Sequence, residues 1–306
     1  MIHIGTFTYS KFKELLLENS KTEIWKIKFK TVQYSEVREK DIVALKDDSG
    51  PIYGYFFVRQ VYHFEHTCSS EFETPKDMYT VELYNDSNNK FRNLIIFDKL
   101  YEMQPIYFRI KTNCSWRIIG KNRLNERKYI GLCGKSGSGK SSAMELVKKL
   151  KFVKYISYSN VIKTRLGLDN NVSRKILQDK SLKYYEKIGA RGYFDFIDKI
   201  ISQNETAKMF IIDGIRNKEV AELFKEKYKG FVCIYFDAMN NPERQQVWSH
   251  PVEAHIEQLR EDSEIIIDNG LYSEKLYDNT KKFIYVLVQN LLGEQDENKQ
   301  EKRNQD

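Results

Sequence analysis

Residues 129–150 decide the fold of this chain and read YIGLCGKSGSGKSSAMELVKKL. The first five form a short apolar run, which predicts a buried strand. Gly134 to Ser141 match the motif G-x-x-x-x-G-K-[S/T] at every fixed position. The remainder, Lys140 to Leu150, predicts an amphipathic helix. A strand that leads through a Gly-rich turn into a helix is the context in which this motif binds phosphate, so we expect a phosphate-binding loop here.

The residue types of this loop suit the phosphates of a nucleotide. Its glycines let successive backbone N–H groups point at one anion, and the positive end of the following helix faces the same anion. Lys140 would reach the β- and γ-phosphates of ATP, and the Ser141 hydroxyl would bind Mg²⁺. A chance match in a Gly/Ser-rich loop is the competing interpretation. The expected nucleotide-binding residues are Gly134, Lys135, Ser136, Gly137, Ser138, Gly139, Lys140, Ser141 and Ser142.

A second element lies at residues 209–216, which read MFIIDGIR. Four apolar residues followed by Asp213 predict a buried strand with a carboxylate at its C-terminal end, where open α/β sheets bind ligands. Asp213 is predicted to hold Mg²⁺ together with Ser141, or to accept a proton from the attacking group. Arg216 is predicted to pair with an acceptor phosphate through two hydrogen bonds. A strand-to-helix turn capped by Asp213 is the alternative.

The order of elements predicts two domains. Further strands are expected at 155–157, 231–236 and 264–267 with helices between them, so residues 129–292 predict an α/β domain with a parallel sheet and flanking helices. Residues 1–118 hold short aromatic and β-branched runs between polar turns, which predict a small, mostly β domain with one helix at residues 9–17. Residues 119–128 are predicted to be a basic linker, and 293–306 a disordered tail.

Composition excludes several classes of protein. The apolar runs of this 306-residue chain are too short to span a membrane, and its start lacks a secretory signal, so we expect a cytoplasmic protein with no membrane partner. The net charge of +7 is spread along the chain, unlike that of a dedicated DNA binder. No two of Cys68, Cys114, Cys133 and Cys233 have C-x-x-C spacing, and the last two are interpreted as core residues.

Together, the two phosphate motifs resemble the nucleoside monophosphate kinase branch of the P-loop proteins. The similarity continues through SYSNVI at 157–162 and IIDGIRNKEVAELF at 211–224 to IIIDNG at 265–270. It includes archaeal nucleotide-kinase-like proteins, dephospho-CoA kinases and phage deoxynucleoside monophosphate kinases. The resemblance implies a P-loop kinase fold for residues 129–292 and phosphoryl transfer that depends on ATP and Mg²⁺.

The resemblance also implies further site residues. Asn160 and Lys163 lie where these kinases begin the helix that binds the acceptor, although the relatives often have Asp and Arg at these positions. Arg165 and Arg174 are candidates for phosphate contacts, with exposed helix cations as the alternative. The arginine-rich lid of the kinases corresponds to residues 241–250, where Arg244 alone matches, so a short lid is expected. The expected catalytic residues are Lys140, Asp213, Arg216 and Arg244.

Residues 39–45 (EKDIVAL) and 52–61 (IYGYFFVRQV) resemble the strand pair of PUA-like domains, including the ASCH type. This implies a PUA-like barrel that could bind nucleic acid, with aromatic residues that either stack on bases or fill a small core. Two functions remain open. The first is a kinase that acts on a nucleotide or nucleoside, free or within nucleic acid. The second is a nucleotide-binding or ATP-hydrolysing module that regulates what the N-terminal domain binds. The short lid favours the module, whereas Asp213 and Arg216 favour the kinase.

Overall fold

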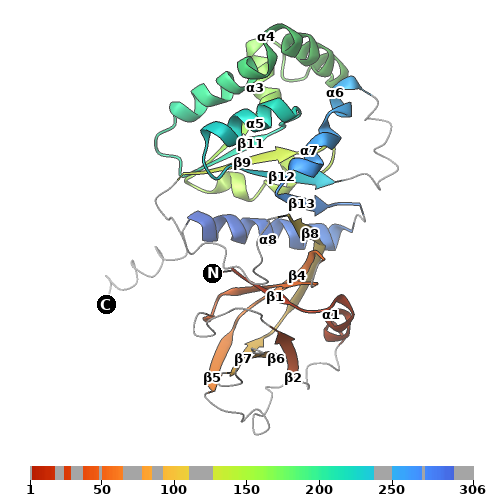
Figure 1. Ribbon diagram of the computed structural model, residues 1–306, viewed down its shortest axis with the longest axis vertical. Helices are drawn as coiled ribbons and strands as arrows, with labels where there is room; N and C mark the ends of the chain where they lie inside the picture. The colour runs from red at the N-terminus through yellow and green to blue at the C-terminus, as the bar shows by residue number, and fades with distance from the viewer. Residues whose placement is uncertain are drawn as a thin grey trace. The chain divides into compact units, whose positions relative to one another are not determined.

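The computed structural model describes residues 2–17, 24–28, 37–47, 50–64, 78–84, 92–109, 127–237, 250–270 and 273–292 (Figure 1). The chain divides into two compact units. Unit 1 comprises Met1–Ile106, Lys111–Leu124 and Glu274–Asp306, and unit 2 comprises Tyr107–Ile110 and Asn125–Ser273. Among the described helices, none is both long and apolar enough to cross a membrane.

Unit 2 is built on a parallel sheet in which β9 lies at the centre, in the order β10-β11-β9-β12-β13. The predicted strands at 155–157, 209–213, 231–236 and 264–267 are confirmed with small shifts of their ends. The strands are β9 (Lys128–Cys133), β10 (Val153–Ser157), β11 (Met209–Asp213), β12 (Val232–Asp237) and β13 (Ile265–Asp268). The α-helices are α2 (Lys140–Ala143), α3 (Tyr158–Arg165), α4 (Arg174–Ser202), α5 (Lys218–Lys227), α6 (Pro251–Ala254) and α7 (Ile256–Asp262).

Apolar side chains from the sheet and the helices form a core cluster in unit 2. All five residues of β11 are buried, as expected of a parallel strand covered on both faces. The ring of Phe224 on α5 lies 4.8 Å from that of Phe194 on α4 and 5.3 Å from that of Phe231, measured between centroids. Cys133 and Cys233 are buried with free thiols, which confirms their interpretation as core residues.

Helix α4 is broken near its middle. Gly189 has φ 66° and ψ −176°, a conformation that interrupts the helical ladder and that side chains with a Cβ rarely adopt. Ser173 caps the start of the helix, where its hydroxyl accepts a hydrogen bond from the backbone N–H of Ile176 at 3.4 Å. The part before the break contains Arg174 and Gln178, whereas the part after it contains core residues such as Phe194.

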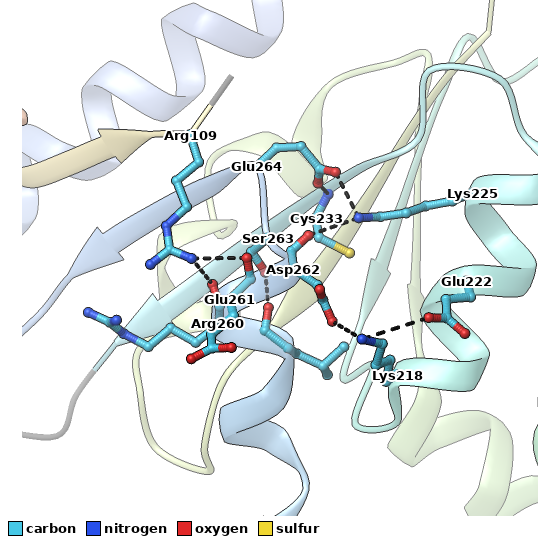
Figure 2. A network of polar contacts seen from close by, with 11 residues as sticks. Arg109, Lys218, Glu222, Lys225, Cys233, Arg260, Glu261, Asp262, Ser263 and Glu264 are labelled. Carbon is cyan, nitrogen blue, oxygen red and sulfur yellow. Dashed lines mark hydrogen bonds and ion pairs between the residues drawn. The ribbon is translucent and has the colours of Figure 1, made fainter. Parts of the chain in front are cut away.

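A network of charged groups fixes the start of β13 (Figure 2). The Glu264 carboxylate accepts hydrogen bonds from the backbone N–H of Cys233 and from Lys225 Nζ, both at 2.7 Å. At the end of α7, Arg109 Nη1 donates to the carbonyls of Arg260 and Glu261, at 3.1 and 2.9 Å. These carbonyls are the groups that a helix leaves unpaired at its C-terminus, so Arg109 acts as a cap.

The continuous helix predicted over 140–150 is wrong. Helix α2 ends at Ala143, and a 3₁₀ turn follows at Val147–Lys149. The backbone N–H of Glu145 bonds to the carbonyl of Ser142, three residues back, where an α-helix would use the residue four back. The apolar residues between Lys140 and Leu150 fit an α-helix as well as a 3₁₀ turn, so the sequence alone does not distinguish the two.

Unit 1 contains a mixed sheet in the order β8-β4-β3-β1-β2-β6-β7-β5. The predicted hairpin is confirmed, since β3 and β4 pair antiparallel, whereas β1 pairs parallel with β3. Its strands are β1 (Ile2–Thr6), β2 (Ile24–Lys28), β3 (Ile42–Lys46), β4 (Ile52–Phe57), β5 (Gln60–Phe64), β6 (Tyr79–Tyr84), β7 (Arg92–Phe97) and β8 (Leu100–Phe108). Its helices are α1 (Tyr9–Leu15) and α8 (Glu274–Leu292).

The last described helix, α8, packs in unit 1. The Tyr55 and Phe283 rings lie 5.3 Å apart, and the Thr280 hydroxyl accepts a hydrogen bond from the backbone N–H of Gln104 at 3.0 Å. The sequence-based division instead assigns 274–292 to the kinase-like domain, because this helix follows the last strand there. Of the other predictions, residues 119–126, the tail at 293–306, Cys68 and Cys114 lie outside the described residues.

Aromatic side chains fill much of the described core of unit 1. Tyr55, Phe56 and Phe97 are fully buried, and the last two stack with centroids 3.9 Å apart. Tyr9 and Tyr62 keep about two-fifths of their surface exposed. The core interpretation therefore holds for most of the aromatic residues that are described, and the PUA-like barrel stays a prediction.

We expect Phe224→Ala to lower the free energy of unfolding by about 3–5 kcal/mol, because it leaves a cavity in the core of unit 2. Urea denaturation followed by circular dichroism measures this change. Ile176→Ala is the matched control, since Ile176 is 46% exposed and its truncation should cost less than about 1 kcal/mol. Equal losses in the two variants would contradict the assigned core.

Candidate functional site

The phosphate-binding motif forms a tight loop between β9 and α2. Gly134, Gly137 and Gly139 have positive φ values of 124°, 77° and 94°. A Cβ atom at Gly134 would also lie 2.4 Å from the carbonyl oxygen of Phe236 on the neighbouring strand β12. Glycine is therefore required at Gly134 both by the backbone conformation and by the close approach of β12.

The side chain of Lys140 turns back into this loop. Its Nζ donates hydrogen bonds to the carbonyls of Gly134 and Lys135 at 2.6 and 2.7 Å, and to Ser138 Oγ at 3.1 Å. Burial lowers the pKa of Lys140 from 10.5 to about 8. The nearby Asp213 carboxylate opposes this shift and Arg216 adds to it. The loop thus encloses a cation at the position where the motif predicts contact with a β- or γ-phosphate.

Asp213 ends β11 next to Ser141 at the start of α2. The Ser141 hydroxyl donates to Asp213 Oδ2 at 2.8 Å, and the Tyr155 phenol donates to the same oxygen. Burial, with a smaller effect of the Asp213 charge, raises the pKa of Tyr155, so this phenol stays protonated as a donor. Asp213 itself is 7% exposed.

The contact between Ser141 and Asp213 fits a magnesium site. It places a hydroxyl and a carboxylate oxygen together, and oxygen atoms are the ligands that Mg²⁺ prefers. Among the described residues there is no group of three or more His, Cys, Asp or Glu side chains that could hold a metal. A site with few protein ligands is typical of Mg²⁺ that also binds substrate phosphates and water.

A buried carboxylate, Glu253 on α6, lies between the loop and Arg216. Glu253 Oε1 accepts hydrogen bonds from Arg216 Nη1 at 2.7 Å and from Gln178 Nε2 at 3.0 Å. Glu253 Oε2 accepts from the backbone N–H of Ser136 at 3.1 Å. The exposed fraction of Glu253 is 0%. Glu253 therefore joins three segments that are remote in sequence: the phosphate loop, α4 and the turn after β11.

Arg174 belongs to the same electrostatic environment. Burial lowers the pKa of Arg174, the positive charge of Arg216 lowers it further, and Glu253 opposes the shift. Arg174 and Arg216 are both cations, so each disfavours the charged form of the other. The side chain of Arg174 keeps part of its surface exposed.

Two further contacts brace the phosphate loop. Lys135 Nζ lies 2.5 Å from Glu257 Oε1 on α7. Asn269, which follows β13, donates from Nδ2 to the carbonyl of Ser138 at 2.8 Å, and its own backbone N–H bonds to the carbonyl of Asp237. Together with the bond from Ser136 to Glu253, these contacts fix the loop from three sides.

The remaining predicted residues make local contacts. Lys163 Nζ donates to the carbonyl of Asn170 at 2.9 Å, the Arg165 guanidinium lies 4.4 Å from the Phe196 ring centroid, and the Asn160 carbonyl accepts from the Thr164 hydroxyl. Their roles in acceptor binding stay predictions, and so does the role of Ser142 in nucleotide binding. Arg244 and most of the expected lid lie outside the described residues.

Sequence reasoning missed Tyr155, Gln178, Glu253 and Asn269. Tyr155 belongs to a predicted strand, and Asn269 directly follows another. Their closeness to the C-terminal edge of the sheet was therefore a usable signal. Glu253 and Gln178 carry no such signal, because their positions depend on how α6 and α4 pack on the sheet.

Comparisons with known proteins find only distant similarity. No protein-family model matches the chain. No curated protein matches it in sequence. Among solved structures, shikimate kinase from Aquifex aeolicus is similar with a TM-score of 0.35 and 19% identity, covering 54% of this chain and 99% of that one. Gluconokinase from Sinorhizobium meliloti is similar with a TM-score of 0.33 and 14% identity, covering 56% and 99%. At these values the likeness carries no functional argument, which depends instead on the contacts described above.

We expect Lys140 to titrate near pH 8, observed by NMR of the labelled lysine side chains with Lys140→Ala to assign the signal. Asp213→Asn should lower this pKa further, because the Asp213 carboxylate favours the charged ammonium. The unfolded chain binds this proton more tightly, so the contribution of Lys140 to stability should increase as the pH rises from about 8 toward 10.5. A midpoint near the ordinary lysine value would contradict the enclosed position of Lys140.

Proposed function

We propose that the chain transfers a phosphoryl group from ATP, with Mg²⁺, to a nucleotide or nucleoside acceptor. One observation carries the proposal: at the C-terminal edge of a parallel sheet, the loop that encloses Lys140 adjoins the contact between Ser141 and Asp213. A phosphate-binding loop, a cation and a pair of oxygen ligands are the parts that phosphoryl transfer needs, because its catalysis depends mainly on positioning and electrostatics.

On the donor side, each residue has a role that its position supports. The N–H groups of the loop and Lys140 would bind the β- and γ-phosphates of ATP. Ser141 and Asp213 would hold Mg²⁺, which neutralises phosphate charge when it is bound. Tyr155, through its hydrogen bond to Asp213, orients the carboxylate.

On the acceptor side, Arg216 and Arg174 are the cations proposed to bind an anionic group. We retain Asn160, Lys163 and Arg165 as proposed acceptor contacts and Arg244 as a proposed clamp on the transferred group. A nucleotide within DNA or RNA is a further acceptor to test. In that case unit 1 is the part of the chain that we propose to bind the nucleic acid.

Formation of ADP from ATP and Mg²⁺ tests the function across a panel of acceptors. The panel contains nucleosides, ribo- and deoxynucleoside monophosphates, dephospho-CoA, and short DNA and RNA. We expect one acceptor class to stimulate ADP release, with the phosphate recovered on that acceptor. Nucleotide binding without any acceptor-dependent turnover would overturn the kinase and favour a regulatory module that binds or hydrolyses ATP.

Lys140→Ala should lower the rate of transfer by about 10²–10³-fold, because it removes one positive group aimed at the developing charge. Lys149→Ala is the matched control, since Lys149 lies in the same segment with an exposed side chain and should keep the wild-type rate. Comparable rates in the wild type and Lys140→Ala would show that the site lies elsewhere.

A further inference from the structure

Glu253 has the environment of a bound anion. Its carboxylate is fully buried and accepts hydrogen bonds from an arginine, a side-chain amide and a backbone N–H, namely Arg216, Gln178 and Ser136. A buried carboxylate is stable only when such partners compensate its lost hydration. Three donors from separate segments of the chain thus meet one small anion.

The same donors suit a phosphoryl group. Arginine binds phosphate oxygens in the way it binds carboxylate oxygens, and a charge-assisted hydrogen bond from a backbone N–H serves both anions. Ser136 lies inside the phosphate-binding motif, whose N–H groups are expected to point at phosphate. In the structure this N–H is given to Glu253 instead.

The charges around Glu253 also favour replacement of its carboxylate by a phosphate. Arg216 Nη1 lies 2.7 Å from the Glu253 carboxylate, and the charges of these two groups also act on Lys140 and on Arg174. A phosphate that entered beside Glu253 would meet a like charge at close range, which is strongly unfavourable in a buried site. A phosphate that replaced the Glu253 carboxylate would inherit its three donors.

We propose that Ser136 N–H, Gln178 and Arg216 form a binding pocket for a phosphoryl group, and that the Glu253 carboxylate occupies this pocket until a phosphate replaces it. Glu253 is then an internal competitor that lowers the affinity of the site for anions. A neutral acceptor cannot displace it, whereas one that carries a phosphate can. This inference rests on the proposed function in one respect, which is the assignment of the bound phosphate to a reactant of phosphoryl transfer.

The affinity of the full chain for inorganic phosphate, measured by isothermal titration calorimetry at constant ionic strength, tests this. Glu253→Gln removes the competing charge and keeps the side-chain shape, so we expect phosphate to bind about tenfold more tightly than in the wild type. Glu261→Gln is the matched control, because it removes one exposed charge from α7 and should leave the affinity unchanged. Adding Arg216→Met to Glu253→Gln should abolish the gain.

Phosphate binding by Glu253→Gln that equals or falls below that of the wild type would overturn the proposal and show that Glu253 is a permanent clamp on Arg216. An equal gain in Glu261→Gln would also overturn it, as a general effect of charge. If Glu253→Gln does not fold, the wild type gives the answer through NMR of the labelled Glu253 carboxyl carbon. Its signal should shift on addition of phosphate, and an unchanged signal at saturation would refute the exchange.

Two reactants could supply the phosphate, and titrations with ATP and ADP, each with Mg²⁺, separate them. A gain in Glu253→Gln for ATP and not for ADP assigns the pocket to the terminal phosphate of the donor. A gain for inorganic phosphate with no gain for either nucleotide assigns it to the phosphate of the acceptor. These are binding measurements, so a chain that transfers no phosphoryl group can still support or refute the role of Glu253.

Discussion

The site depends on one constraint: a loop of six residues must enclose the ammonium group of Lys140. Three positive φ values bend the backbone, two loop carbonyls meet the ammonium, and the approach of β12 leaves no room for a side chain at Gly134. Burial of the ammonium is unfavourable by itself, and the nearby carboxylates of Asp213 and Glu253 compensate part of it. The rest of the site surrounds this enclosed cation.

The parallel sheet brings together residues that are far apart in the sequence. The strands β9, β11 and β10 are neighbours, so Ser141, Asp213 and Tyr155 meet at one edge although they lie far apart in the chain. The loops and helices after the strands then add contacts from other directions, through Glu257 and Asn269. A phosphate site formed in this way is held by many elements, each of which contributes one group.

Much of this could be predicted from the sequence, because strong patterns specify local structure. The apolar run before Gly134 and the run that ends at Asp213 predict two strands and a carboxylate at the end of the second. Glu253 could not be found in the same way, since a single acidic residue on a short helix has no pattern and its burial depends on tertiary packing. The pairing of α8 with unit 1 was missed for a similar reason, because apolar periodicity shows that a helix is covered and not what covers it.

The two parts of the broken helix α4 carry different kinds of residue. Arg174 and Gln178, which lie near the site, precede Gly189, and the residues that fill the core, such as Phe194, follow it. Tyr193, which follows the break, still holds the earlier half, because its hydroxyl donates to the Ser181 carbonyl at 2.8 Å and its ring lies 5.1 Å from that of Tyr185. The half that positions Gln178 is therefore anchored to the hydrophobic interior, so the chemistry of the site and the stability of the core are linked through one side chain.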